Sequence, residues 1–183
     1  MAEKIYDSRA VANLMLEEAR RNNRPLSHLA LQKLLYFAHA LFLVEKKRPL
    51  VSGYFEAWEY GPVHPAVYQA FKSVREMPIG APAARQDPLT GECTPIEPPN
   101  DPEVREHITR VMAHYGRLTA GRLVDISHAK DAPWHFVVDK SRTNLSFGLR
   151  ITDDVILSRF KHHKVSIGGQ PSIGEPCEDT PPS

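Results

Sequence analysis

The chain has 183 residues, of which 42% are hydrophobic and 25% are charged, and these proportions are typical of one globular domain with a hydrophobic core. Its 23 lysines and arginines nearly balance its 22 acidic residues, so the formal net charge is +1. A protein that depends on contacts to phosphate usually has an excess of basic residues. The charge balance therefore argues against nucleic acid as a partner.

Targeting segments and cysteine frameworks are not evident in the sequence. Residues 1–4 lack the apolar core of a signal peptide. The apolar run at residues 34–44 is interrupted by His39 and is shorter than the roughly 20 residues that a membrane helix needs. Cys93 and Cys177 lie in proline-rich surroundings, so neither a disulfide framework nor a cysteine zinc site is expected. We therefore expect a cytoplasmic protein that does not enter a membrane.

Two helices are predicted in the first 50 residues. The first runs from about Ser8 to Arg21, with the Ser8 hydroxyl as its N-cap and an apolar face at helical spacing. The second covers about residues 28–47, with Ser27 as its N-cap and Pro49 after its end. Apolar residues cover most of its circumference, which is typical of the central helix of a domain.

An aromatic segment at residues 54–60 predicts a strand or an extended stretch. Alternation places Phe55 and Ala57 on one side and Trp58 and Tyr60 on the other. One side must face the core. The other is either covered by the following helix or available to a partner, because tryptophan and tyrosine are favoured in binding hot spots.

The rest of the chain alternates proline-rich sequence with short helices. After a turn at Gly61-Pro62, Pro65 is well placed to begin a helix. Residues 78–102 predict a proline-rich surface loop within the domain, and a short hairpin around Thr90-Gly91 is one alternative. Further helices are predicted to begin at three N-cap residues, which are Asp101, Thr119 and Thr152.

The expected fold class is therefore mainly α. We predict a compact single helical domain over residues 1–163 with a small extended or β element. Residues 164–183 contain no aromatic residue and several prolines and glycines, so they predict a disordered C-terminal tail.

Three motifs occur in order along the chain. They are residues 31–39 (LQKLLYFAH), residues 55–63 (FEAWEYGPV) followed by Pro65 and Val67-Tyr68, and a third group that includes Tyr115-Gly116, Leu118-Thr119-Ala120, Leu123, Ser127-His128 and Pro133-Trp134. Together they are more specific than any one alone. In this order they resemble the SocA-like antitoxins of the bacterial Panacea family, and the resemblance spans about residues 5 to 160.

The resemblance implies an antitoxin that binds a small cognate toxin protein and acts as a proteolytic adaptor, presenting the toxin to the ClpXP protease. The alternative is an antitoxin or a phage-related regulator that neutralises by direct binding or that binds nucleic acid to repress transcription. No cofactor, metal or catalytic residue is expected. The candidate residues, for partner binding or for structure, are Gln32, Lys33, Tyr36, His39, Glu56, Trp58, Tyr60, His64, Tyr68, His128 and Trp134.

The polar residues of the first motif carry more detailed expectations. Gln32 and Lys33 lie beside a very apolar helix face, so we expect them to hydrogen-bond to a neighbouring loop. Lys33 could alternatively pair with Glu56 or Glu59. We interpret His39 as a buried structural histidine with its hydrogen bonds satisfied.

The sequence does not predict an enzyme. A metal or acid–base cluster of His39, His64 and His128 is the remaining alternative. Against it, His64 and His128 each lie next to a turn residue or a helix end, where capping explains them adequately. A zinc hydrolase would show two histidines closely spaced on one helix, and neither a glycine-rich phosphate loop nor a nucleophile elbow is recognisable. The pair at residues 162–163 suits the negative end of a helix dipole.

Overall fold

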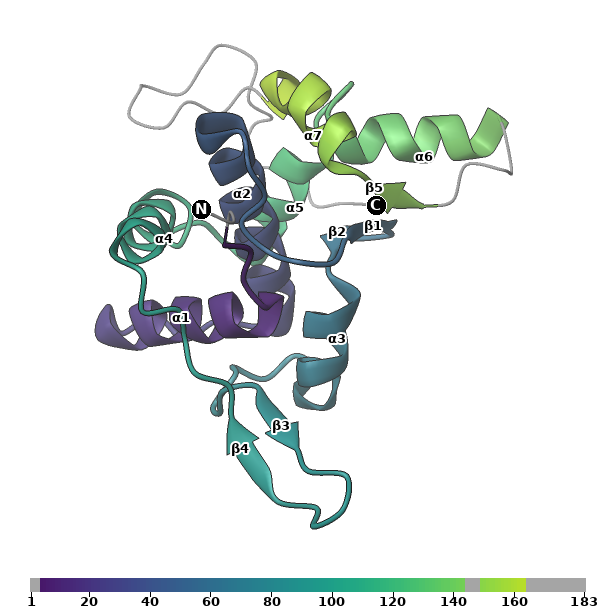
Figure 1. Cartoon of the computed structure of the whole chain (residues 1–183). Coiled ribbons are helices and arrows are strands. Elements are labelled where there is room, and N and C mark those ends of the chain that lie inside the picture. Colours follow the sequence, from purple (N-terminus) through teal and green to yellow (C-terminus); the bar gives the residue numbers. More distant parts are fainter. Residues whose placement is uncertain (1–3, 144–148, 164–183) are drawn as a thin grey trace.

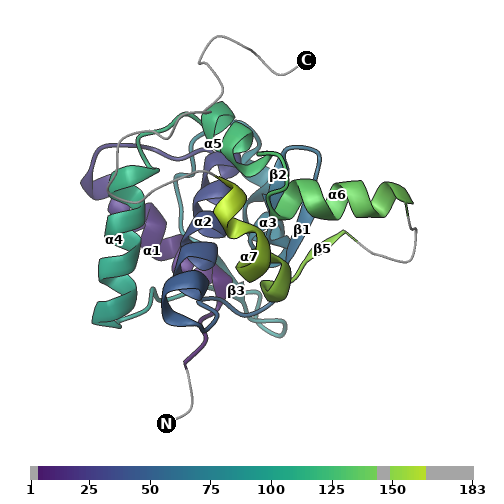
Figure 2. The same cartoon turned by 90° about the horizontal axis from the view of Figure 1, so that it is seen from above.

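The computed structural model describes residues 4–143 and 149–163 of the chain. Helices and a small three-stranded sheet surround one central helix, α2 (Figures 1 and 2). The elements are α1 (Ser8–Arg21), α2 (His28–Lys46), β1 (Phe55–Trp58), β2 (Gly61–Val63), α3 (Pro65–Phe71), η1 (Lys72–Val74), β3 (Ala84–Gln86), β4 (Cys93–Pro95), α4 (Pro102–His114), α5 (Ala120–Ser127), α6 (Pro133–Thr143), β5 (Arg150–Ile151), α7 (Asp153–Arg159) and η2 (Phe160–His163). This mainly α domain with a small β element confirms the predicted fold class.

Helix α2 is buried around its whole circumference from Ala30 to Leu43. The Ser27 side chain accepts a hydrogen bond from the Ala30 N–H at 3.2 Å, as the sequence predicts. Its C-cap Lys47 adopts a left-handed conformation with φ 58°, a common way to end a helix. The helices packed against α2 include α1, α4, α5 and α7.

The N-cap of α1 differs from the predicted one. Ser8 is the first helical residue and is buried, and the cap is Asp7. The Asp7 carboxylate accepts from the backbone N–H of Arg9 at 2.8 Å and also pairs with its guanidinium. Aspartate and serine are comparable caps. The extra ion pair therefore gives a physical reason for the cap to lie one residue earlier.

The predicted strand at the aromatic segment forms the middle of an antiparallel sheet with the order β2-β1-β5. Phe55 and Ala57 are buried, whereas Glu56 and Trp58 are half-buried, so the predicted alternation is confirmed. The third strand, β5, lies far along the chain and pairs Ile151 with Phe55. A strand of two residues leaves no recognisable sequence pattern.

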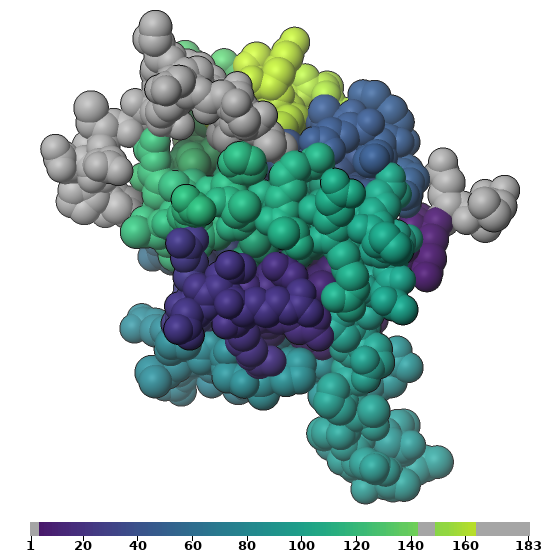
Figure 3. All heavy atoms as spheres, turned by 90° about the vertical axis from the view of Figure 1, so that its left-hand side faces the viewer, coloured from purple at the N-terminus to yellow at the C-terminus, as the bar shows by residue number. Residues whose placement is uncertain are grey.

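Within the proline-rich segment, β3 and β4 form the hairpin that the sequence left as one alternative, with Arg85 opposite Thr94. All six strand residues are exposed, and the hairpin projects from the body of the molecule (Figures 1 and 3). Asn13 of α1 holds its base. The amide nitrogen of Asn13 donates to the carbonyls of Ala83 and Ile96 at 2.9 and 2.7 Å, and its oxygen accepts from the Ala83 N–H at 2.7 Å.

Three of the later helices begin at their predicted caps, Asp101, Thr119 and Thr152. Helix α6 was not predicted. It begins at Pro133, a favoured first helical residue, and packs beside β1, β5 and α7 (Figure 1). Its apolar residues end at Val138 and are mostly half-buried, so they form no long helical stripe in the sequence. Contacts with distant parts of the chain stabilise the helix.

No helix in residues 4–143 and 149–163 is long and apolar enough to cross a membrane. The predicted tail at residues 164–183 lies outside the described residues.

Candidate functional site

The polar residues of the first motif attach strand β2 and the residue that follows it to the central helix. The Gln32 side-chain oxygen accepts from the His64 N–H at 2.8 Å, and the Gln32 amide nitrogen lies 3.3 Å from Nε2 of His28. The Lys33 ammonium donates to the Pro62 carbonyl at 2.7 Å. These bonds confirm the expected contact with a neighbouring loop.

Lys33 has no exposed surface, and among the described residues its amine does not pair with a carboxylate. The structure thus corrects the alternative of an ion pair with Glu56 or Glu59. Burial disfavours the charged amine and lowers the pKa of Lys33 to about 7. Gly61 lies directly against this side chain with φ 95°, and a Cβ at that position would come within 2.9 Å of the lysine Cε. Lys33 is therefore a tightly enclosed structural residue.

Tyr36 and His39 attach the C-terminal elements to α2. The Tyr36 hydroxyl lies 3.0 Å from Nε2 of His163, whose Nδ1 lies 3.0 Å from the Ile126 carbonyl. Because a carbonyl only accepts, Nδ1 carries the proton and Nε2 accepts from Tyr36. Burial lowers the pKa of His163 to about 4. This residue is neutral and enclosed, so the expectation of a cation at a helix end is wrong for it.

His39 is the satisfied structural histidine that the sequence predicts. Its Nδ1 accepts from the Val51 N–H at 3.4 Å, and its Nε2 lies 2.9 Å from the Asp153 carboxylate at the start of α7. Since Nδ1 accepts, Nε2 carries the proton and donates to Asp153. The ring connects α7 and the segment before β1 to the central helix.

The three histidines of the catalytic alternative do not form one cluster, because His39 and His64 both pack against the Phe55 ring whereas His128 packs against Trp134. His64 precedes α3 and has its Nε2 2.9 Å from the Ser52 carbonyl. His128 ends α5 and stacks on Trp134, with ring centroids 3.7 Å apart, and burial lowers its pKa to about 4. Within residues 4–143 and 149–163, no group of three His, Cys, Asp or Glu residues is placed to hold a metal ion.

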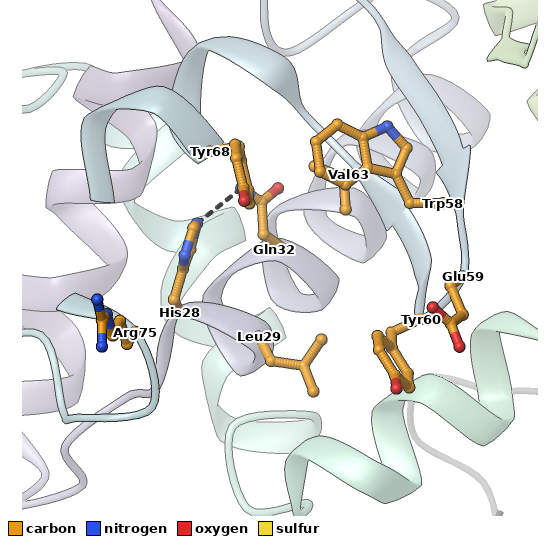
Figure 4. A pocket seen from close by; sticks show the side chains of 9 residues that line it. All are labelled: His28, Leu29, Gln32, Trp58, Glu59, Tyr60, Val63, Tyr68 and Arg75. Atoms are coloured by element: carbon orange, nitrogen blue, oxygen red, sulfur yellow. Dashed lines mark hydrogen bonds between the residues drawn. The ribbon is translucent and has the colours of Figure 1, made fainter. Parts of the chain in front are cut away.

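An open groove of about 270 Å³ lies where α2, the end of β1, α3 and η1 meet. Figure 4 labels nine lining side chains, which are mainly aromatic and apolar and come from four stretches of the chain. We call it the aromatic groove. Its lining includes Leu29, Trp58, Glu59, Tyr60, Tyr68 and Arg75.

The aromatic side chains of the groove are held in place from behind. The Trp58 indole N–H donates to the Glu56 carboxylate at 2.8 Å, and its ring centroid lies 4.7 Å from that of Tyr68. The Trp134 indole N–H donates to the Trp58 carbonyl at 2.8 Å. Tyr60, in contrast, is 57% exposed. The groove thus combines a fixed wall with an accessible rim.

The predicted residues therefore fall into two sets. Four of them, Gln32, Trp58, Tyr60 and Tyr68, line the groove, and the others hold the elements around it together. Glu59 and Val63 of the second motif also line the groove but were not among the candidates, and His28, Leu29 and Arg75, which lie outside the motifs, were missed as well. The last three come from a helix start and from the end of η1, and no sequence pattern connects these positions.

The architecture is that of a helical scaffold that presents an aromatic groove. A model of the SocA-like antitoxin family with a Panacea domain matches residues 31–135, which is more than half of the chain, and the chain belongs to this family. Antitoxin SocA of Caulobacter vibrioides (strain NA1000 / CB15N) is 49% identical over 177 residues, which cover 97% of this chain and 94% of that protein. No solved structure matches the chain significantly.

Proposed function

We propose that this chain is an antitoxin that binds a small cognate toxin protein and presents it to the ClpXP protease. The observation that carries the proposal is the 49% identity, over 97% of the chain, to a protein named as an antitoxin. In this role the chain makes and breaks no covalent bond itself. It binds a folded or partly folded partner, and the protease removes that partner.

Two features of the molecule support a protein partner. The net charge of +1 suits a protein surface better than a polyanion. The aromatic groove exposes the residue types that dominate protein–protein hot spots, on a scaffold whose elements are joined by the bonds of Lys33, Tyr36 and His39. A surface that is already ordered loses little conformational entropy on binding.

The proposal is tested in cells by expressing the small protein encoded beside this chain's gene, with and without the chain, in hosts that have or lack ClpX. We expect the neighbouring protein to stop growth, and the chain to restore growth and shorten the protein's half-life only where ClpX is present. Rescue without ClpX would replace the adaptor role by neutralisation through direct binding. Absence of rescue in both hosts would refute the antitoxin assignment.

A reconstituted reaction separates an adaptor from a simple inhibitor. With purified ClpXP and ATP, a small molar fraction of the chain should accelerate degradation of an excess of the neighbouring protein, while the chain itself persists. A requirement for equimolar chain, or degradation at the same rate without it, would contradict the adaptor role.

A further inference from the structure

We propose that the aromatic groove is where this chain captures its toxin, and that the occupant is one large apolar side chain of the toxin with an acidic residue beside it that pairs with Arg75. This inference rests on the proposed function, because it assigns a surface to the partner named there. It adds the chemistry of the segment that the surface accepts.

The size of the groove favours a side chain over a small molecule. Its volume is about 270 Å³, whereas pockets for drug-sized ligands run from about 300 to 1,000 Å³ and enclose most of the ligand. An open hollow of this size suits one anchoring residue of a protein partner. Anchors of this kind carry most of the binding energy of an interface.

The lining is arranged to receive such an anchor. Its buried residues are His28, Gln32 and Val63. Leu29 of α2 is half-buried and lies between Arg75 and Tyr60, across from Trp58 and Tyr68 (Figure 4). The bond from Trp58 to Glu56 and its contact with Tyr68 hold the indole ring in one orientation. An inserted apolar side chain would therefore contact a surface that is ordered before binding, at low entropic cost.

Charges at the two ends specify what flanks the anchor. Arg75 lies at one end of the groove and Glu59 at the other (Figure 4). Within the part of the chain that the structure describes, neither side chain takes part in an ion pair. Electrostatic complementarity then calls for an acidic residue of the toxin near Arg75 and favours a basic one near Glu59.

The backbone at Arg75 supplies an independent observation. This residue has φ 53° and ψ −123°, a conformation that is strained for any residue except glycine. Strained non-glycine residues cluster at active sites, ligand clamps and switch regions. Arg75 occupies a backbone conformation that suits glycine. This supports a role for its guanidinium in pairing with an acidic residue of the toxin.

The test measures binding of the purified neighbouring protein to the full chain by calorimetry. Three groove variants are compared with the unaltered chain: Leu29→Glu, Tyr60→Ala and Arg75→Glu. Each should weaken binding by about tenfold or more, the range of interface hot spots. The matched controls are Leu157→Glu on α7 and Lys72→Glu on η1, which make the same changes at exposed residues outside the groove. Both should bind within about twofold of the unaltered chain.

Arg75→Gly separates binding from folding. Relief of the backbone strain should raise the midpoint of thermal unfolding while affinity falls by about tenfold. If all the groove variants bind the neighbouring protein as tightly as the unaltered chain does, the groove proposal is wrong but the proposed function stands. The same conclusion follows if the groove instead binds a second copy of this chain. If the unaltered chain does not bind the neighbouring protein, both the proposed function and this inference fail.

Discussion

Replacing Lys33 by methionine should make the fold more stable at neutral pH and remove most of the dependence of stability on pH above 7. In the fold, burial lowers the pKa of Lys33 from 10.5 to about 7. The unfolded chain keeps the usual value, so between these two pH values it binds more protons than the folded chain does. The free energy of unfolding must then rise with pH in this window.

The magnitude follows from the size of the shift. Each pH unit inside the window adds about 1.36 kcal/mol, so the unaltered chain should gain about 3 kcal/mol between pH 7 and pH 9.5 from this group. At pH 7 the cost of burying Lys33 is about 4 kcal/mol. Lys33→Met removes that cost but leaves the Pro62 carbonyl without its donor, which costs about 1–3 kcal/mol. The net expectation is a variant about 2 kcal/mol more stable at pH 7 and slightly less stable at pH 10.

Urea denaturation followed by circular dichroism at several pH values between 7 and 10 measures this effect. The quantity to compare is the difference in the free energy of unfolding between Lys33→Met and the unaltered chain at each pH. Groups that titrate in the same way in both chains cancel in this difference. A difference that does not change with pH, or one that grows in favour of Lys33→Met as pH rises, would refute the account of a buried, mainly desolvated amine.

Three further substitutions test other parts of the scaffold. Asn13→Ala should lower the free energy of unfolding by about 3 kcal/mol, because it removes three hydrogen bonds at the base of the hairpin. Limited proteolysis should then cut the hairpin faster than in the unaltered chain, and equal rates would argue against a clamp. Gly61→Ala should cost about 3 kcal/mol in urea denaturation, since φ is 95° and the new Cβ would lie 2.5 Å from the Ser127 hydroxyl oxygen. Adding Ser127→Ala should recover part of the loss, and no recovery would exclude the clash as its cause. Tyr36→Phe should cost about 1–2 kcal/mol in thermal unfolding by leaving His163 Nε2 without a donor, and an unchanged midpoint would show that this bond contributes nothing.

Local interactions explain which helices could be predicted. The cap at Ser27, the apolar circumference that follows and the proline after its end belong to one short stretch of sequence, and they place α2 within one residue at its end. The caps at Thr119 and Thr152 were recognisable for the same reason. The cap of α1 was misplaced by one residue, because Asp7 and Ser8 are both good caps and the Asp7–Arg9 ion pair favours the first.

Long-range contacts explain the misses. Helix α6 and strand β5 depend on packing against β1 and α7, so their own residues carry little periodicity. The sequence predicted that His163 interacts with the negative end of a helix dipole, but its ring lies between Tyr36 and Ile126 and is neutral. Whether a polar side chain is buried depends on elements distant in the chain, and a local pattern does not reveal them.

The amino-acid sequence by itself determined the helical class of this protein, its central helix, the alternating strand and, through three ordered motifs, its family. Only the tertiary structure decided that the motif residues Lys33 and Tyr36 act inside the scaffold. It also brought Leu29 and Arg75 to the same groove as the aromatic strand. The physical reason is that caps and periodicity act over a few residues, whereas burial, pKa and the shape of a groove depend on side chains that meet only after the chain has folded.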